Sequence, residues 1–185
     1  MILTERLVLK PSDTAFAGEL VRYYTENAEY FAPYNPAYTP GYCTVERQEK
    51  LLENEICLAE KGRGRYYYMF LKDAPDRLSG IISFVRIRPL PYASTIFGYD
   101  LDHSLWGLGI ATEGCRAAIA DVFANTDVHR IEARVSENNS RSVKLLEKLG
   151  FTYEGNEYKS IFINGEFRDH KRYALLKSQD LLLPR

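Results

Sequence analysis

Short runs rich in apolar and β-favouring residues recur along the chain and predict β-strands. They cover residues 7–10, 65–71, 78–87, 95–101, 131–135, 152–163 and 167–176. Residues 73–76, which contain Asp and Pro, and residues 89–91, which contain two Pro, are predicted turns. Asn164 followed by Gly165 is typical of a two-residue hairpin loop. The pattern predicts a sheet of six or seven strands.

Two amphipathic segments between the first and second runs predict helices. Ser12 is expected to cap the first helix, which ends near residue 24, and Thr44 to cap the second, which ends at Gly62. Three prolines within residues 30–42 argue against regular structure between these helices. The apolar face of the second helix is expected to consist of Leu51, Leu52, Ile56 and Ala59.

Two further helices are predicted in the second half of the chain. Residues 109–124 form the first of them, and residues 139–149, followed by Gly150, form the second. The expected order is one strand, two helices, three strands, a helix, a strand, a helix and two strands. This order describes an α+β fold with about four helices.

The composition is that of one compact domain covering residues 1–185. Hydrophobic residues make up 45% of the chain, enough for one sizeable core, and no linker divides it. A net charge of −1 shows no basic excess, so no direct nucleic-acid partner is expected. No apolar run approaches the roughly 20 residues that span a bilayer, so no membrane segment is expected. Charges interrupt the first ten residues, so no signal peptide is expected either.

The cysteines and histidines predict no disulfide framework and no metal site. Cys43, Cys57 and Cys115 are odd in number, far apart and form no CxxC pair, and the three histidines are scattered. Reduced thiols in a cytoplasmic protein are the simplest interpretation.

The stretch from Tyr99 to Glu113 carries the clearest chemical pattern. A predicted strand ends near Leu101, and a predicted helix begins near Gly109 after a turn through Gly107. The first N–H groups of a helix have no intrahelical partner and point, with the positive end of the dipole, at whatever lies there. A pyrophosphate suits this position. An ordinary glycine-rich connection remains the alternative.

A Rossmann dinucleotide site fits this loop poorly. Thr112 stands where that motif needs Gly or Ala, and Arg130 lies near the position of its acidic residue. The loop also lies past mid-chain, whereas a Rossmann loop belongs to an early strand–helix–strand unit.

A second pattern lies in the helix predicted over residues 139–149. Asn139 and Ser142 are three positions apart and share a face, while Leu145, Leu146 and Leu149 supply the core side. Asn139 alone could be a helix cap. Ser142 lies deeper in the helix, where capping is less common.

Together these patterns resemble the GNAT acetyltransferase superfamily. The resemblance rests on Trp106-x-x-Gly109-x-Ala111, on Asn139-x-x-Ser142 and on the run Leu146-Glu-Lys-Leu-Gly-Phe151. Trp106 departs from the usual Gln or Arg at the first position, which puts a side-chain contribution there in doubt.

Other segments are similar to the ribosomal-protein N-terminal acetyltransferases of the RimJ/RimL type, and the ending fits the alanine-specific side best. The matching segments begin at Thr4, Tyr23, Phe31, His129, Glu154 and Ile163. Coverage is nearly the whole chain.

The resemblance implies a GNAT-like mixed, mostly antiparallel sheet with a V-shaped opening between its fourth and fifth strands, which end near Leu101 and Val135. Acetyl-CoA would enter that opening, with no metal required. The implied cofactor-binding residues are Leu101, Asp102, Gly107, Leu108, Gly109, Ile110, Ala111, Thr112, Asn139 and Ser142. An amide near Leu101 or Asp102 would polarise the thioester carbonyl.

The resemblance makes Ser142 the expected catalytic residue, protonating or stabilising the leaving thiolate. Leu146 stands where many GNAT enzymes carry a tyrosine acid, and Ile161 stands near the glutamate of the serine-specific branch. The candidate bases are Glu26, Glu132, Glu157 and Asp169, each of which could equally be a solvated or salt-bridged carboxylate.

The implied acceptor is a primary amine. An α-amine has a pKa near 8, against about 10.4 for lysine, so a protein N-terminus needs only a modest base. A small amine such as an antibiotic, polyamine or amino acid is the first alternative, and a non-catalytic acyl-CoA-binding domain is the second. Residues 30–42 are expected to cover the acceptor mouth, although their aromatic side chains could equally form a packed lid without contact to the substrate. The protein is expected to be a monomer or homodimer.

Overall fold

The computed structural model describes residues 1–178 and contains one mixed sheet of eight strands. The strands are β1 (Ile2–Leu3), β2 (Leu7–Lys10), β3 (Arg65–Leu71), β4 (Ala74–Arg88), β5 (Ser94–Leu101), β6 (Arg130–Ser136), β7 (Thr152–Ile163) and β8 (Glu166–Leu176). Their order across the sheet is β1-β2-β3-β4-β5-β6-β8-β7, and only the β5–β6 pair is parallel. The mixed, mostly antiparallel α+β fold is confirmed. Residues 179–185 of the predicted domain lie outside the described residues.

Two strand predictions need correction. The sheet has eight strands because the two residues of β1 pair with β2, and so short a segment has no recognisable alternation. The predicted turn at residues 73–76 is shorter than expected, since β4 already begins at Ala74. The Asn164–Gly165 turn is confirmed: both residues have positive φ (51° and 86°), as this hairpin type requires.

Five α-helices and two 3-10 turns surround the sheet. They are η1 (Thr14–Phe16), α1 (Ala17–Glu26), α2 (Ala28–Phe31), α3 (Val45–Glu60), η2 (His103–Leu105), α4 (Ile110–Asn125) and α5 (Ser140–Lys148). Among residues 1–178, no helix is both long and apolar enough to cross a membrane.

The helix predictions hold with three corrections. Asp13, rather than Ser12, caps the first helical turn by accepting from the Ala15 amide, while Ser12 donates to Glu55. The short helix α2 occupies the start of the segment expected to be irregular. Ala59 is exposed instead of packed in the core. Thr44 caps α3 as predicted.

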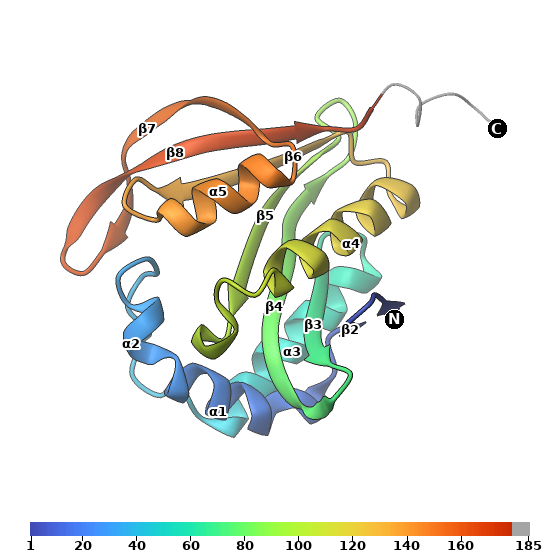
Figure 1. Ribbon diagram of the computed structural model, residues 1–185, viewed down its shortest axis with the longest axis vertical. Coiled ribbons are helices and arrows are strands. Elements are labelled where there is room, and N and C mark those ends of the chain that lie inside the picture. The colour runs from blue at the N-terminus through green and yellow to red at the C-terminus, as the bar shows by residue number, and fades with distance from the viewer. Residues whose placement is uncertain (179–185) are drawn as a thin grey trace.

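The helices cover the sheet on both faces (Figure 1). Strand β3 is therefore buried on both of its faces. Tyr67 and Met69 point into the core beneath α4 and α5, whereas Tyr66, Tyr68 and Phe70 point to the α1 and α3 side. The two sides of the sheet therefore hold separate apolar clusters, and both anchor helices whose ends reach the candidate site.

The sheet opens beside the parallel pair. β5 and β6 are in register from Ser94–Arg130 to Phe97–Ala133, and their pairing ends there although both strands continue. The strands diverge toward α5 and the start of α4 (Figure 1). This is the V-shaped opening predicted between strands ending near Leu101 and Val135.

Candidate active site

The start of α4 presents unpaired backbone amides to a cavity. Gly109 occupies the N-cap position of α4 with φ of 78°. It has no side chain that could accept a hydrogen bond from the first amides of the helix. The first α4 bond runs from the Glu113 amide to the Gly109 carbonyl, so the amides of Gly109, Ile110, Ala111 and Thr112 precede it. All four residues line one cavity of about 320 Å³, called the first cavity below. Four convergent N–H groups suit an anion such as a pyrophosphate.

Residues from the turn between β1 and β2 hold this loop in place. The Arg6 guanidinium donates to Glu113 Oε2 at 2.7 Å and to the Leu108 carbonyl at 2.9 Å. Glu113 Oε1 also accepts from the Thr4 hydroxyl and the Arg6 amide, at 2.6 and 2.7 Å. Burial of Glu113 is outweighed by these hydrogen bonds, which lower the pKa of its carboxyl.

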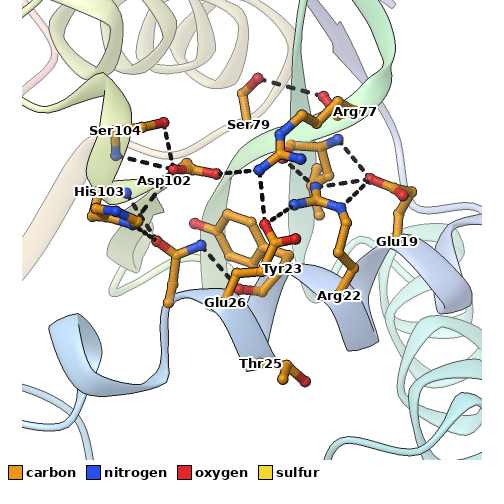
Figure 2. A network of polar contacts seen from close by, with 12 residues as sticks. Glu19, Arg22, Tyr23, Thr25, Glu26, Arg77, Ser79, Asp102, His103 and Ser104 are labelled. Carbon is orange, nitrogen blue, oxygen red and sulfur yellow. Dashed lines mark hydrogen bonds and ion pairs between the residues drawn. The ribbon is translucent and has the colours of Figure 1, made fainter.

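A second network ties the preceding turn to α1 (Figure 2). Asp102 accepts from the Ser104 amide and hydroxyl and lies 3.6 Å from Arg77, which also pairs with Glu26 of α1. The His103 amide donates to the Asn27 side chain at 2.9 Å. The turn between β5 and α4 is therefore fixed from two sides.

The opposite wall of the first cavity is cationic. Arg141, Lys144 and Lys148 of α5 line it. The guanidinium of Arg141 lies 3.9 Å from the centre of the Trp106 ring, and the Trp106 indole N–H donates to the Leu101 carbonyl at 3.1 Å. Trp106 thus places a cation beside the cavity by cation–π contact.

Eight of the ten predicted cofactor residues line the first cavity, and two do not. Those that line it are Leu101, Gly107, Gly109, Ile110, Ala111, Thr112, Asn139 and Ser142. Asp102 does not, because its amide donates to the Ser79 carbonyl at 2.8 Å and its carboxylate joins the network of Figure 2. Leu108 does not, because its side chain is 57% exposed and its carbonyl is held by Arg6.

The Asp102 hydrogen bond also orients Leu101. Backbone groups of successive strand residues face opposite neighbours. Since the Asp102 amide faces β4, the Leu101 amide faces the opening between β5 and β6. One backbone amide of β5 is thereby directed at the place where the first cavity meets the opening.

Ser142 lies where two cavities meet. Together with Asn139 and Tyr99 it lines both the first cavity and a second cavity of about 310 Å³ between the diverging strands. Asn139 caps α5 by accepting from the Ser142 amide at 3.1 Å. Burial raises the pKa of Tyr99 to about 12, although contact with the Ser142 hydroxyl opposes the rise. The Ser142–Tyr99 pair therefore offers protonated hydroxyl groups at the junction.

None of the four candidate bases lines the cavities described here. Glu26 pairs with Arg22 and Arg77, Glu132 with Arg130, and Glu157 with Arg134. Asp169 accepts from the Lys159 amide. The salt-bridging alternative therefore holds for the three glutamates.

Sequence reasoning missed Asp100. This residue lines the first and second cavities and a third cavity of about 460 Å³, which lies beneath residues 34–42. An acidic residue inside a β-strand next to a glycine-rich loop was the available signal. Successive side chains of a strand point to opposite faces of the sheet. The sequence does not show which of these faces borders the cavities, so the position of Asp100 could not be predicted.

The segment of residues 30–42, called the lid below, forms the outer wall. Tyr30 stacks on His103 with ring centres 3.8 Å apart, and Asn35 donates to Asp100 at 3.4 Å. The Asn164 side chain at the tip of the β7–β8 hairpin donates to the Ala32 carbonyl at 2.9 Å. The lid is thus attached both to the loop before α4 and to the hairpin.

Comparison with known proteins identifies the family. The model of the acetyltransferase (GNAT) domain matches residues 6–152. The chain belongs to the GNAT acetyltransferase family. Its relatives include named N-acetyltransferases, so this GNAT protein is an enzyme that transfers an acyl group to an amine. The resemblance drawn from the cofactor motifs is confirmed.

Similar proteins cover nearly the whole chain. A probable N-acetyltransferase of Bacillus subtilis, YjcK, is 32% identical over 97% of this chain and 99% of its own. The ribosomal protein uS5-alanine N-acetyltransferase of Escherichia coli is 28% identical over 94% and 89%. The structure of a ribosomal-protein-S5-alanine acetyltransferase from Vibrio fischeri superposes with a TM-score of 0.90 at 26% identity, covering 95% of both chains.

A relative named for a different acceptor matches a shorter part of this chain. The spermidine N(1)-acetyltransferase of Vibrio cholerae is 30% identical over 60% of this chain and 64% of its own. The relatives therefore include enzymes named for ribosomal-protein alanine and for a small amine.

Proposed function

We propose that this enzyme transfers the acetyl group of acetyl-CoA to the N-terminal α-amine of a protein, as a ribosomal-protein-alanine N-acetyltransferase does, by direct attack in a ternary complex in the cytoplasm. The observation that carries acetyl-CoA binding is the first cavity, in which four open amides at the start of α4 face Arg141, Lys144 and Lys148. Both features attract a pyrophosphate.

The residues of this chain divide the work of the transfer. Acetyl-CoA, when bound, supplies the acetyl group as a thioester. The amides of Gly109 to Thr112 hold its phosphates, and the Leu101 amide, directed into the opening, donates to the carbonyl oxygen as negative charge develops there. Ser142 donates its hydroxyl proton to the departing sulfur and regains a proton from the attacking nitrogen, relayed through the adjacent Tyr99.

Two features support a protein N-terminus as acceptor. The relatives named for ribosomal-protein alanine match 89–95% of their own length. The second and third cavities continue from the first beneath the lid, which gives an extended acceptor path. A small amine such as spermidine is the competing acceptor.

A turnover assay tests the proposal. The enzyme is incubated with acetyl-CoA and, separately, with an alanine-starting peptide, a serine-starting peptide and spermidine, and released thiol is measured. The expected result is the highest kcat/KM on the alanine-starting peptide. A preference for spermidine would assign a small-amine acceptor, and acetyl-CoA binding without thiol release from any acceptor would contradict catalysis.

A further inference from the structure

Asp100 occupies an unusual place in the fold. It lines all three cavities, and no other Asp or Glu among residues 1–178 lines any of them. The first cavity contains the open α4 amides, the second contains Ser142, and the third opens beneath the lid. A group bound to the Asp100 carboxylate can therefore face the thioester region and the acceptor path at once.

The Asp100 carboxylate lacks a counterion. Its single hydrogen bond among the described residues comes from Asn35 of the lid at 3.4 Å, and it forms no salt bridge with them. Burial raises the pKa of Asp100, and the Asn35 bond only partly opposes this. The pKa of Asp102, two residues later, is lowered because hydrogen bonds from Ser104 and the charge of Arg77 outweigh burial. A carboxylate retained without compensation is costly to the fold and marks a functional position.

Three tyrosines form the wall of the third cavity beside Asp100. Tyr38 and Tyr42 stack with ring centres 4.4 Å apart, and Tyr24 meets both edge-on at 5.4 and 5.3 Å. The Tyr38 hydroxyl is buried without a hydrogen-bond partner of normal geometry among residues 1–178. Aromatic faces beside a carboxylate attract an ammonium group, and an unpaired hydroxyl can accept from it.

We propose that Asp100 receives the acceptor as a protonated amine, with Tyr24, Tyr38 and Tyr42 enclosing it, and removes the proton that blocks its attack on acetyl-CoA. The proposal rests on the acetyl transfer proposed above. It names the acceptor class as a cationic primary amine delivered beneath the lid. It also gives the enzyme the base that Glu26, Glu132, Glu157 and Asp169 are not placed to supply.

The protons and bonds balance in this scheme. Asp100 takes one proton from the R–NH3⁺ group, and the freed lone pair forms the C–N bond at the thioester carbonyl carbon. The C–S bond breaks, and its electron pair leaves on sulfur. The second proton leaves the nitrogen and reaches the sulfur through Ser142. Asp100 then returns its proton to solvent, so R–NH3⁺ and acetyl-CoA become the amide, the free thiol and one proton.

Several titratable groups surround Asp100 and shape its pH response. The groups that share a cavity with it are Arg141, Lys144 and Lys148 in the first cavity, Arg134 and His170 in the second, Arg47 in the third, and Tyr30, Tyr34 and Tyr99. Four further tyrosines, Tyr23, Tyr24, Tyr38 and Tyr42, also face it. Burial raises the pKa of each of these four tyrosines, so all four stay neutral near pH 7. Arg47 is exposed at the rim of the third cavity. Among residues 1–178, Asp100 is the one carboxyl group that lines these cavities, so we expect it to set the acidic limb of the rate profile.

The decisive variant is Asp100→Asn, with Asp76→Asn as a matched control on the exposed part of β4. In wild type, log kcat/KM should fall at low pH along an acidic limb. Asp100→Asn should lower kcat/KM for the alanine-starting peptide by about 100–1,000-fold at pH 7.5 and remove that limb. The affinity for acetyl-CoA, measured by calorimetry, should change by less than about 3-fold. Asp76→Asn should behave as wild type.

An acceptor amine that is already neutral distinguishes two causes of a defect in Asp100→Asn: loss of proton removal and incorrect positioning of the acceptor. Trifluoroethylamine is largely unprotonated at pH 7.5, so the Asp100→Asn defect on it should shrink to less than about 10-fold. An equal defect on both acceptors would overturn the proton-removal role. A folding defect is checked by the thermal midpoint: the raised pKa of Asp100 means its charged form destabilises the fold as pH rises, so Asp100→Asn should be at least as stable as wild type at pH 8.

The experiment distinguishes failure of the Asp100 role from failure of the proposed acetyl transfer. If wild type acetylates an amine and Asp100→Asn retains at least a third of kcat/KM, the role of Asp100 is overturned while acetyl transfer stands. If wild type binds acetyl-CoA but acetylates none of the peptides, spermidine or trifluoroethylamine, the transfer itself fails and the role of Asp100 fails with it.

Discussion

The guanidinium of Arg141 lies 3.9 Å from the centre of the Trp106 ring, at the wall of the first cavity. The Trp106 indole is itself fixed, because its N–H donates to the Leu101 carbonyl. The ring therefore forms a platform that holds a cation at this wall. This relationship makes Trp106 a positioning residue for the proposed phosphate site.

Trp106→Ala should weaken acetyl-CoA binding by about 3- to 10-fold, because Arg141 loses the cation–π contact that orders it. Calorimetry at low salt measures the effect. Tyr92→Ala is the matched control, since Arg88 lies over the Tyr92 ring at 4.8 Å outside the first cavity. Unchanged affinity in Trp106→Ala would show that Arg141 does not depend on the ring.

Gly109→Val should abolish the rise in thermal midpoint that acetyl-CoA produces in wild type. A β-branched residue is strained at φ of 78°, and its side chain would disturb the loop whose amides face the cavity. Gly165→Val carries similar backbone strain at φ of 86° in the distant hairpin turn. That control should lower stability yet keep the ligand-induced shift. A normal shift in Gly109→Val would refute the phosphate-loop assignment.

Ser142→Ala should lower kcat by about 10–1,000-fold with little change in acetyl-CoA affinity, because the lost proton donor acts on the leaving group. Ser140→Ala, on the exposed start of the same helix, should leave the rate unchanged. Single-turnover rates at saturating acetyl-CoA make the comparison. Tyr99→Phe should cause a smaller loss, since Ser142 remains. An unaltered single-turnover rate in Ser142→Ala would remove it from the catalytic residues.

Glu113→Gln should lower the thermal midpoint at pH 7 by about 3–6 °C, since it breaks charge-assisted bonds to Thr4 and Arg6. The pKa of Glu113 is lowered in the fold, so its stabilising contribution is present above the unfolded pKa near 4.3. It is lost as pH falls through the folded pKa. The difference from wild type should therefore vanish in strong acid.

Glu46→Gln provides the control for this pH series. Glu46 pairs with Lys50 at 2.7 Å on the exposed side of α3, where ion pairs contribute little. Its midpoint should match wild type across the same pH range. A Glu113→Gln difference that persists at low pH would mean that the loss comes from packing instead of charge.

The sequence by itself determined most of the local structure and the family. Periodicity and turn residues located seven strands and the ends of α3, α4 and α5, because Thr44, Gly109 and Gly150 carry conformational preferences that act within a few residues. The spacing of Gly109, Ala111, Asn139 and Ser142 predicted the cofactor loop for the same reason, and all four residues line the first cavity. Cap and loop chemistry is local, so it is readable along the chain.

Only the tertiary structure decided which side chains converge. Asp102 and Asp100 are two positions apart, yet one joins a charged network with Arg77 and the other lies alone among three cavities. The candidate bases pair with arginines that are distant in sequence, such as Arg77 with Glu26. Desolvation and charge pairing depend on long-range packing of the lid, the sheet opening and α5. The cavities around Asp100 are formed by segments that are distant in sequence, so only the tertiary structure could indicate it as the proposed base.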